Sequence, residues 1–385
     1  MPWGSQLISS LFERSDYSTL TDATYLNQAS LGLIGQPALD AMHEFLEVIG
    51  RHGNLYMSDN DEVGFLEALI DRASRLFGGD ARRLAILSSA SELLGQAPFV
   101  LPPPSQVSVM VVSSDFPAIT RPWLRLVEQG KCHLDFVDES PESDLTSDLI
   151  AHIDERTFLI AVSHVQYATG TVIDVPRLQA ATAAAGVRLV IDVTQSAGAI
   201  KTKIGFWDVD IVVSSGYKWL GGHGGVAVGA LSPDLLQETP PMPGWMGSPT
   251  PFDFDATRLR LAEGGRRYTQ ATMSYISVVG LTAAIDQLLT VGVEKIEHHA
   301  ERLAHKLVDG VAAYGWQPFR HLDDPAASPH IVSLGHQDHK LGKVSNRLRD
   351  VGVVCSNRGG RLRVSLAPYN DENDITALVG ALAQV

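Results

Sequence analysis

The sequence predicts an α/β fold with a large domain, built on a mainly parallel mixed sheet covered by helices, and a small α+β C-terminal domain. Short apolar runs of the kind that form buried strands alternate with amphipathic stretches up to about residue 235. Such alternation is typical of a parallel or mixed sheet with helices on both faces. After a Pro-, Gly- and Trp-rich connection over 235–270, the pattern changes to a long helical stretch, two strand-like runs and a final helix. This change indicates the smaller domain.

The first expected element is a short strand and turn at 24–32, and a helix with apolar residues at helical spacing follows over 36–50. Apolar runs then predict strands at 84–87, 107–112, 132–137, 158–165, 188–192, 210–215 and 225–231. The later elements are one long helical region over 275–314, strands at 330–335 and 361–367, and a last helix within 373–385. Ligands of such sheets bind at the carboxyl ends of strands, so residues just after these runs are the first site candidates.

Composition limits the classes of partner. The chain has 385 residues, 45% hydrophobic and 19% charged, which is typical of a soluble globular protein. Its net charge of −14 argues against nucleic acid or an anionic membrane surface as partner, because phosphates are bound by basic patches. Two cysteines, Cys132 and Cys355, are too few for a disulfide framework and form no C-x-x-C metal pair, so we expect a cytoplasmic protein without a metal. Neither secretion nor membrane insertion is indicated.

Lys218 and Asp192 are the most informative residues. Lys218 follows the apolar run 210–215, which predicts that its amine lies at the end of a buried strand, where loss of hydration makes it a nucleophile toward an aldehyde. Asp192 ends the run 188–192 and can hold a cationic ring nitrogen. Such a lysine and such a carboxylate are what pyridoxal 5'-phosphate (PLP) chemistry requires. The alternative for Lys218 is a solvated strand end, because lysine is rarely buried.

Other residues are candidates for holding the phosphate of this cofactor. Ser91, with the backbone amides of Ala90 and Ser91, follows the run 84–87 at the start of a helix, where an anion is favoured. The alternative is a plain serine N-cap. Ser215 and Tyr217 provide further hydroxyl groups beside the lysine.

Three more residues are candidates for contacts with the ring. Phe116 follows the run 107–112 and is placed to stack on the ring, with a role in the core as the alternative. Gln195, three residues after Asp192, can hydrogen-bond the phenolic oxygen, and so can Tyr167.

Arginines near the C-terminal end are candidates for binding a substrate carboxylate, because a guanidinium binds a carboxylate through two hydrogen bonds. The candidates are Arg358, Arg361 and Arg363. On a strand, Arg361 and Arg363 share one face and Leu362 takes the other. The alternative is a solvated charged face.

With these residues identified, the chain resembles the class V aminotransferase superfamily of fold-type I PLP enzymes. This group holds cysteine desulfurases, isopenicillin N epimerase-like proteins, kynureninases and related C–S lyases. The resemblance covers essentially the whole chain, and its motifs occur in order: YLNQASLG, SSASE, DFP, SHVQYATGTVIDV, DVTQSAGA, SSGYKWLGG, GWMGS, GRRYTQAT and LRVSLAPYN.

The resemblance implies a fold-type I PLP-dependent transferase with three parts. Residues 1–30 would form an N-terminal segment of the small domain and the active-site entrance. Residues 31–270 would form the large PLP-binding domain, and 271–385 the connecting helix and the small C-terminal domain.

The resemblance also implies a role for each matching residue. Lys218 is similar to the Schiff-base lysine and Asp192 to the pyridinium partner. Gln195 would lie at the phenolic oxygen, Phe116 on the ring, and Arg363 at the substrate carboxylate.

Further matching residues concern the substrate and a second subunit. Asn27 and Arg358 join Arg363 as substrate-binding candidates. Thr272 matches a threonine that in relatives reaches the phosphate of the neighbouring subunit. This match implies a homodimer with shared active sites.

Departures from the family patterns narrow the function. Cysteine desulfurases place a nucleophilic cysteine on a loop shortly before the arginine strand, whereas here Cys355 precedes only a short turn. Kynureninases carry an Asp three residues after the stacking Phe and a His at the glutamine position, where this chain has Ile119 and Gln195. Ala271 replaces the usual Gly before Thr272.

The preferred hypothesis is a PLP-dependent lyase that forms an external aldimine with an amino acid or a cysteine conjugate and expels sulfur by β-elimination. An aminotransferase, an epimerase and a decarboxylating or oxidative enzyme use the same residues, because the cofactor carries the chemistry. A non-catalytic PLP-binding protein is the hypothesis from another class.

Overall fold

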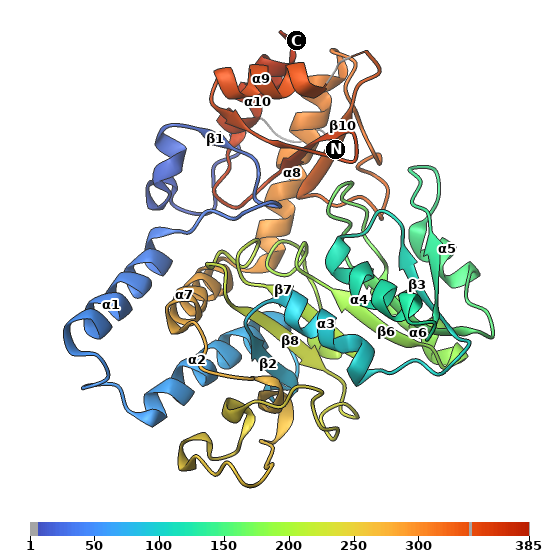
Figure 1. The fold of residues 1–385 in the computed structure, drawn as a ribbon. Coiled ribbons are helices and arrows are strands. Elements are labelled where there is room, and N and C mark those ends of the chain that lie inside the picture. Colours follow the sequence, from blue (N-terminus) through green and yellow to red (C-terminus); the bar gives the residue numbers. More distant parts are fainter. Residues whose placement is uncertain (1–6, 339–340, 385) are drawn as a thin grey trace.

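The computed structural model describes residues 7–338 and 341–384, so the predicted segments that include 1–6, 339–340 and 385 lie partly outside the described residues (Figure 1). Its large sheet has the strand order β2-β8-β7-β6-β5-β3-β4. Strand β8 is antiparallel to both neighbours, and the other neighbouring pairs are parallel. The predicted mainly parallel mixed sheet is confirmed. The strands are β2 (Leu84–Leu87), β3 (Ser108–Val112), β4 (His133–Val137), β5 (Thr157–Ser163), β6 (Arg188–Asp192), β7 (Ile211–Ser215) and β8 (Ala227–Leu231).

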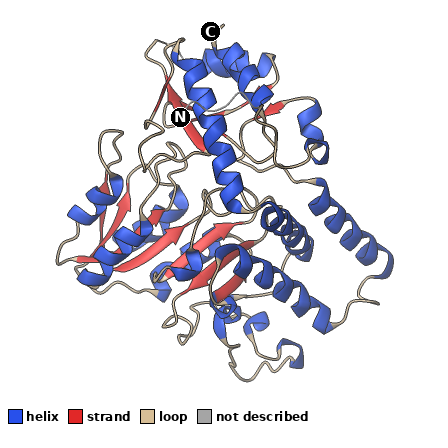
Figure 2. Ribbon diagram, turned by 180° about the vertical axis from the view of Figure 1, so that it is seen from behind, coloured by secondary structure: helices blue, strands red, loops and turns tan. Residues whose placement is uncertain are grey.

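Helices cover both faces of this sheet, as Figure 2 shows. Successive side chains of a strand point to opposite faces, so a strand covered on both sides is apolar throughout. In β6, Leu189 and Ile191 enter the apolar cluster that holds α2 and α7, whereas Val190 enters the cluster that holds α3 and α4. These helices are α2 (Asp59–Phe77), α3 (Ala90–Val100), α4 (Pro117–Glu128), α5 (Leu145–Ala151), α6 (Val175–Ala185) and α7 (Tyr275–Val291). Helix α1 (Gln36–His52) packs against α7.

The small domain is built on a four-stranded antiparallel sheet with the order β12-β13-β10-β9. One apolar cluster, which includes Trp316, Leu362 and Ile375, joins this sheet to its helices. Its elements are α8 (Val293–Ala312), β9 (Gln317–Pro318), β10 (Ile331–Gly335), α9 (Leu341–Asp350), β11 (Val353–Val354), β12 (Ser356–Arg358), β13 (Arg361–Ser365) and α10 (Glu372–Leu382).

The N-terminal segment lies against the small domain, and Figure 1 shows it in blue beside the red C-terminal elements. Strand β1 (Thr24–Tyr25) pairs in parallel with β11. Arg14 Nη1 donates to the carboxylate of Asp374 at 2.7 Å and to the carbonyl oxygen of Tyr369 at 2.8 Å. The domain boundaries at residues 30 and 270 stay a prediction.

The region expected to be helical over 275–314 is helical, but it is not one continuous helix. It is divided into α7 and α8, whose axes differ by 77°, with the break at Gly292. Gly292 has a φ of +88°, a conformation that glycine adopts without steric cost and that ends α7. Within the described part of the chain, no single helix is long and apolar enough to span a membrane, and only this bent pair passes that test by length and composition.

Gly170 controls how closely the large domain approaches the small one. Its φ is +80°, and a Cβ atom there would lie 2.2 Å from the carbonyl oxygen of Ile331 in β10.

We therefore expect Gly170→Ala to lower the free energy of unfolding, measured in urea. The left-handed backbone conformation should cost an alanine about 1–2 kcal/mol, and the steric overlap should cost roughly a further 1–3 kcal/mol. Gly186→Ala is the matched control, because Gly186 has a φ of +68° with open space around it. Equal losses in both variants would contradict the close approach.

Candidate active site

One cavity brings together nine of the ten residues that the sequence suggested for cofactor binding. Ser163, Asp192 and Ser215 end the parallel strands β5, β6 and β7, so the cavity lies at the carboxyl edge of the large sheet. The nine residues are Ala90, Ser91, Phe116, Tyr167, Asp192, Gln195, Ser215, Tyr217 and Lys218. Ala118, Ser163 and Thr194 also line it.

Lys218 is buried, and its Nζ lies 5.4 Å from the centre of the Phe116 ring. Burial lowers the pKa of the amine to about 8; the charge of Asp192 opposes this shift, and the charges of Arg363 and Arg358 add to it. An amine with such a pKa is partly neutral near pH 7 to 8 and carries the lone pair that a nucleophile needs. The alternative interpretation of Lys218 as a solvated strand end therefore does not apply, because its side chain is buried.

The backbone of Lys218 is fixed by the N-terminal segment. Gln28 is buried, and its Nε2 donates to the carbonyl oxygen of Lys218 at 2.9 Å. The backbone N–H of Gly32 donates to the carbonyl oxygen of Tyr217 at 3.0 Å. A Cβ on Gly32 would lie 2.5 Å from the carbonyl oxygen of Lys218, so only glycine allows this approach.

Asp192 supplies the buried negative charge of the site. One carboxylate oxygen accepts the backbone N–H of Thr194 at 2.8 Å, and the Thr194 hydroxyl accepts the backbone N–H of Ser215 at 3.0 Å. Burial raises the pKa of Asp192, whereas the hydrogen bonds of Thr194 and the charge of Lys218 oppose this shift. The buried carboxylate thus has a cation as its electrostatic partner.

A second buried carboxylate, Asp115, supports the wall that carries Phe116. Its Oδ1 accepts the N–H of Phe116 and the Ser163 hydroxyl, both at 2.6 Å, and its Oδ2 accepts the N–H of Ser163 at 2.8 Å and Gln166 Nε2 at 3.3 Å. Burial raises the pKa of Asp115 to about 6, although these hydrogen bonds lower it. Phe116 is 40% exposed, and its ring meets that of Tyr167 edge-on at 5.4 Å. Phe116 therefore lies on the cavity and not in the core.

The side-chain amide of Gln195 is held in one orientation. Its Oε1 accepts Trp219 Nε1–H at 2.8 Å, and its Nε2 donates to the carbonyl oxygen of Ala29 at 3.0 Å. An amide nitrogen has two N–H groups, so one remains for an oxygen in the cavity.

At the start of α3 the serine N-cap is Ser89, whereas Ser91 lies on the cavity, and binding of a phosphate there stays a prediction. Ser89 is the N-cap, and its hydroxyl accepts the N–H of Glu92 at 3.1 Å. Ala90 and Ser91 are the first helical residues and line the cavity. Their N–H groups belong to the first turn, which has no intrahelical partners and attracts an anion.

The three substrate-binding candidates lie beside this cavity. Arg363 is buried in β13; its Nη1 donates to the carbonyl oxygen of Tyr167 at 2.7 Å, and its Nη2 donates to the Ser30 hydroxyl. Arg358 Nη2 also donates to Ser30, at 3.4 Å. Asn27 Oδ1 and Arg363 Nε are buried and have no hydrogen-bond partner among the described residues.

Two suggested residues lie elsewhere in this chain. Thr272 is exposed and does not line the cavity. Arg361 lies over the Phe319 ring at 5.4 Å and donates to the carbonyl oxygen of Gln317 at 3.0 Å, so it is directed away from the site.

Sequence reasoning missed the residues that support the site through distant contacts. Gln28, Ser30 and Gly32 lie in the motif YLNQASLG, and Asp115 lies next to the stacking candidate in DFP. Both motifs belong to the family resemblance, so the sequence carries a signal for them. Neither motif shows which of its residues touches Lys218 or the arginines.

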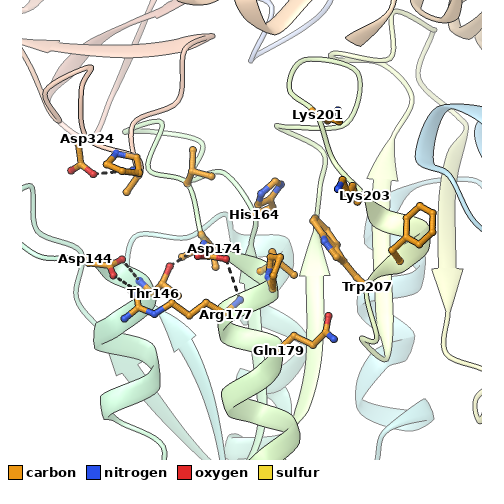
Figure 3. Close-up of a pocket in the computed structure, with 17 residues that line it drawn as sticks. Asp144, Thr146, His164, Asp174, Arg177, Gln179, Lys201, Lys203, Trp207 and Asp324 are labelled. Atoms are coloured by element: carbon orange, nitrogen blue, oxygen red, sulfur yellow. Dashed lines mark hydrogen bonds and ion pairs between the residues drawn. The ribbon is translucent and has the colours of Figure 1, made fainter. Parts of the chain in front are cut away.

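A larger cavity, of about 860 Å³ against about 40 Å³ for the site described above, is lined by His164, Lys203 and Trp207 among others (Figure 3). Two of its three lysine and arginine side chains, Arg177 and Lys201, are paired with Asp144 at 2.5 Å and Glu294 at 2.8 Å. It contains none of the suggested cofactor or substrate residues. Size alone does not identify the site, and we assign it by its chemistry.

The residues of the smaller cavity fit PLP. Lys218 provides an amine for the aldehyde, Asp192 a carboxylate for the ring nitrogen, and Phe116 an aromatic face. Ala90 and Ser91 provide a helix N-terminus for the phosphate.

The lowered pKa of Lys218 makes loading of the cofactor pH-dependent. A protonated amine has no lone pair, so the rate at which apoprotein acquires the absorbance band of lysine-linked PLP should rise with pH, with a midpoint near 8. Asp192→Asn removes the charge that raises this pKa and should move the midpoint to lower pH. Asp253→Asn, which changes an exposed carboxylate paired with Arg260, should leave it in place. A midpoint near 10.5 in the parent would contradict the buried amine.

Comparisons with known proteins identify the family of the chain. The family model for aminotransferase class-V matches residues 85–378. Relatives include the uncharacterized aminotransferase YcbU of Bacillus subtilis, 25% identical over 96% of both chains, and a probable cysteine desulfurase of Methanothermobacter thermautotrophicus, 23% identical over 97% of both.

Solved structures share the fold. A mutant of C-DES with glycine covalently linked to the PLP cofactor has a TM-score of 0.87 at 20% identity, over 97% of this chain and 99% of the other. The complex of the cystine C–S lyase C-DES with cysteine persulfide has a TM-score of 0.86 at 20% identity, over 95% and 99%. The chain therefore belongs to the aminotransferase class-V family and is a PLP-dependent enzyme.

Proposed function

We propose that the protein is a lyase that breaks the C–S bond of cysteine or of a cysteine conjugate by β-elimination. The observation that carries the proposal is the buried Lys218 amine, which lies in one cavity with Asp192 and within electrostatic reach of Arg358 and Arg363. Relatives named cysteine desulfurases and a structural neighbour named a cystine C–S lyase support sulfur as the leaving atom.

When bound, PLP supplies an electron-withdrawing ring that takes up the electron pair left at the substrate α-carbon. Asp192 would hold the ring nitrogen and favour its protonated form. Arg363 binds the substrate carboxylate, and Lys218, with its lowered pKa, removes the α-proton. For a conjugate R–S–CH₂–CH(NH₃⁺)–COO⁻, elimination and uptake of one water give R–SH, pyruvate and ammonium, with no oxidant or reductant needed.

Cys355 supports a lyase without a protein-bound persulfide. Burial raises the pKa of its thiol to about 12, and the charge of Arg363 opposes this shift only in part. The residue packs against the apolar cluster of the small domain. Because the thiolate is the nucleophile, a thiol with a raised pKa is a weak nucleophile at neutral pH.

An aminotransferase is the second candidate, because the relative YcbU carries that name and the same site residues serve both reactions. An aminotransferase would need an added keto acid and would return a new amino acid. The epimerase, the decarboxylating or oxidative enzyme and the non-catalytic PLP-binding protein have no such specific support.

We further propose a homodimer in the cytoplasm. Thr272 is exposed and outside its own cavity, where it can reach a second copy. Large apolar side chains on the surface support a subunit contact, among them Leu55, Tyr56 and Phe254 at 69–71% exposure. The free cysteines Cys132 and Cys355 support a reducing compartment.

The reaction type follows from the products. We expect the holoenzyme to release pyruvate, ammonium and a thiol from cysteine conjugates without an added keto acid, and Lys218→Ala to lose nearly all of this turnover. Coupled lactate dehydrogenase and a thiol reagent measure the products. Formation of a new amino acid only when a keto acid is added would show an aminotransferase instead.

Cys355 should be dispensable for the chemistry. Cys355→Ser is expected to keep most of the parent turnover, and mass spectrometry after incubation with cysteine should find no persulfide on the protein. Cys132→Ser, at the other cysteine, which is buried, is the matched control. Loss of sulfur release in Cys355→Ser alone, with PLP still bound, would favour a desulfurase with a cysteine nucleophile.

A further inference from the structure

Two guanidinium groups meet at one hydroxyl beside the active site. Arg363 and Arg358 come from the paired strands β13 and β12, and both donate to Ser30 Oγ. Ser30 belongs to the N-terminal segment and lies close to Asn27, whose side-chain oxygen is buried without a partner among the described residues. Two like charges are thus held together at one point of the site.

Neither charge is neutralised by the protein. Among the residues that the structure describes, no carboxylate forms an ion pair with Arg358 or Arg363; their other hydrogen bonds go to the carbonyl oxygens of Asn357 and Tyr167. By contrast, the buried Arg320 is paired with Asp324 at 3.1 Å. Removing a guanidinium from water without a nearby counter-charge costs free energy, and an anion bound in the cavity would offset this cost.

The two arginines differ in how firmly they are held. Arg363 is 1% exposed and is fixed through two of its nitrogens by Tyr167 and Ser30. Arg358 is half-buried at the end of β12, next to Gly359 and Gly360, and its contact with Ser30 is long at 3.4 Å. Arg363 is therefore a fixed site for a group that all substrates share, and Arg358 is free to adjust to a group that varies.

We propose that the substrate carries a second acidic group, and that Arg358 selects for it while Arg363 binds the α-carboxylate. Within the proposed C–S lyase function, on which this inference rests, the substrate class is cysteine conjugates whose sulfur substituent bears a carboxylate. The charges of both arginines reach Lys218, so both acidic groups can be bound while the α-carbon is near its amine.

The test uses two conjugates that differ only in this charge: S-carboxymethyl-L-cysteine, an acid, and S-carbamoylmethyl-L-cysteine, its amide. Affinity is read from the change in the absorbance band of the bound cofactor on titration, and turnover from pyruvate release. We expect the parent holoenzyme to prefer the acid by roughly 10- to 100-fold in Kd and kcat/KM, the range for a hydrogen bond to a charged group.

Arg358→Gln should bring the acid-to-amide ratio close to one. Arg361→Gln is the matched control on the same hairpin, since its guanidinium lies over Phe319, and it should keep the parental ratio. The inference is overturned if the parent binds acid and amide equally, if Arg358→Gln keeps the preference, or if both variants lose it alike.

The binding titration and the turnover assay also distinguish a failure of this inference from a failure of the proposed function. A binding preference for the acid without release of pyruvate would end the lyase proposal and leave the role of Arg358 standing. Release of pyruvate from both conjugates with equal kcat/KM would support the lyase proposal and contradict the selective role of Arg358.

Discussion

The burial of one amine at the edge of the large sheet is the constraint on which the rest of the site depends. Lys218 loses hydration at the end of β7, and this loss is what lowers its pKa to about 8. Asp192, at the end of the neighbouring strand β6, limits that shift with its negative charge. The parallel arrangement of β6 and β7 is what puts the two residues on one side, because their carboxyl ends coincide.

The chain segment 27–32 connects the parts of the site. Gln28 holds the backbone of Lys218, Ala29 accepts from Gln195, and Ser30 accepts from both arginines. Lys218, the Gln195 amide and the two arginines are therefore all held by one short segment. A change in this segment therefore acts on all three at once.

Local patterns in the sequence predict the strands and the residues that end them, because burial on both faces of a sheet requires a continuous apolar run. Lys218 and Asp192 could be identified for this reason. The break at Gly292 could not, since the residues on either side of it continue the helical pattern and only its φ of +88° ends α7. Gln28 and Asp115 were missed because their roles arise from contacts with residues far away in sequence, which periodicity does not record.

The pairing of β1 with β11 has a consequence for the order of events during synthesis. Arg14 hydrogen-bonds Asp374 across 360 positions, and Ser30 meets Arg358 and Arg363 across more than 320. A ribosome has therefore translated the chain as far as these partners before the N-terminal segment can contact them. The large sheet can form earlier, but the substrate-binding arginines arrive only with β12 and β13, so a nascent chain that lacks these strands cannot bind its substrate through them.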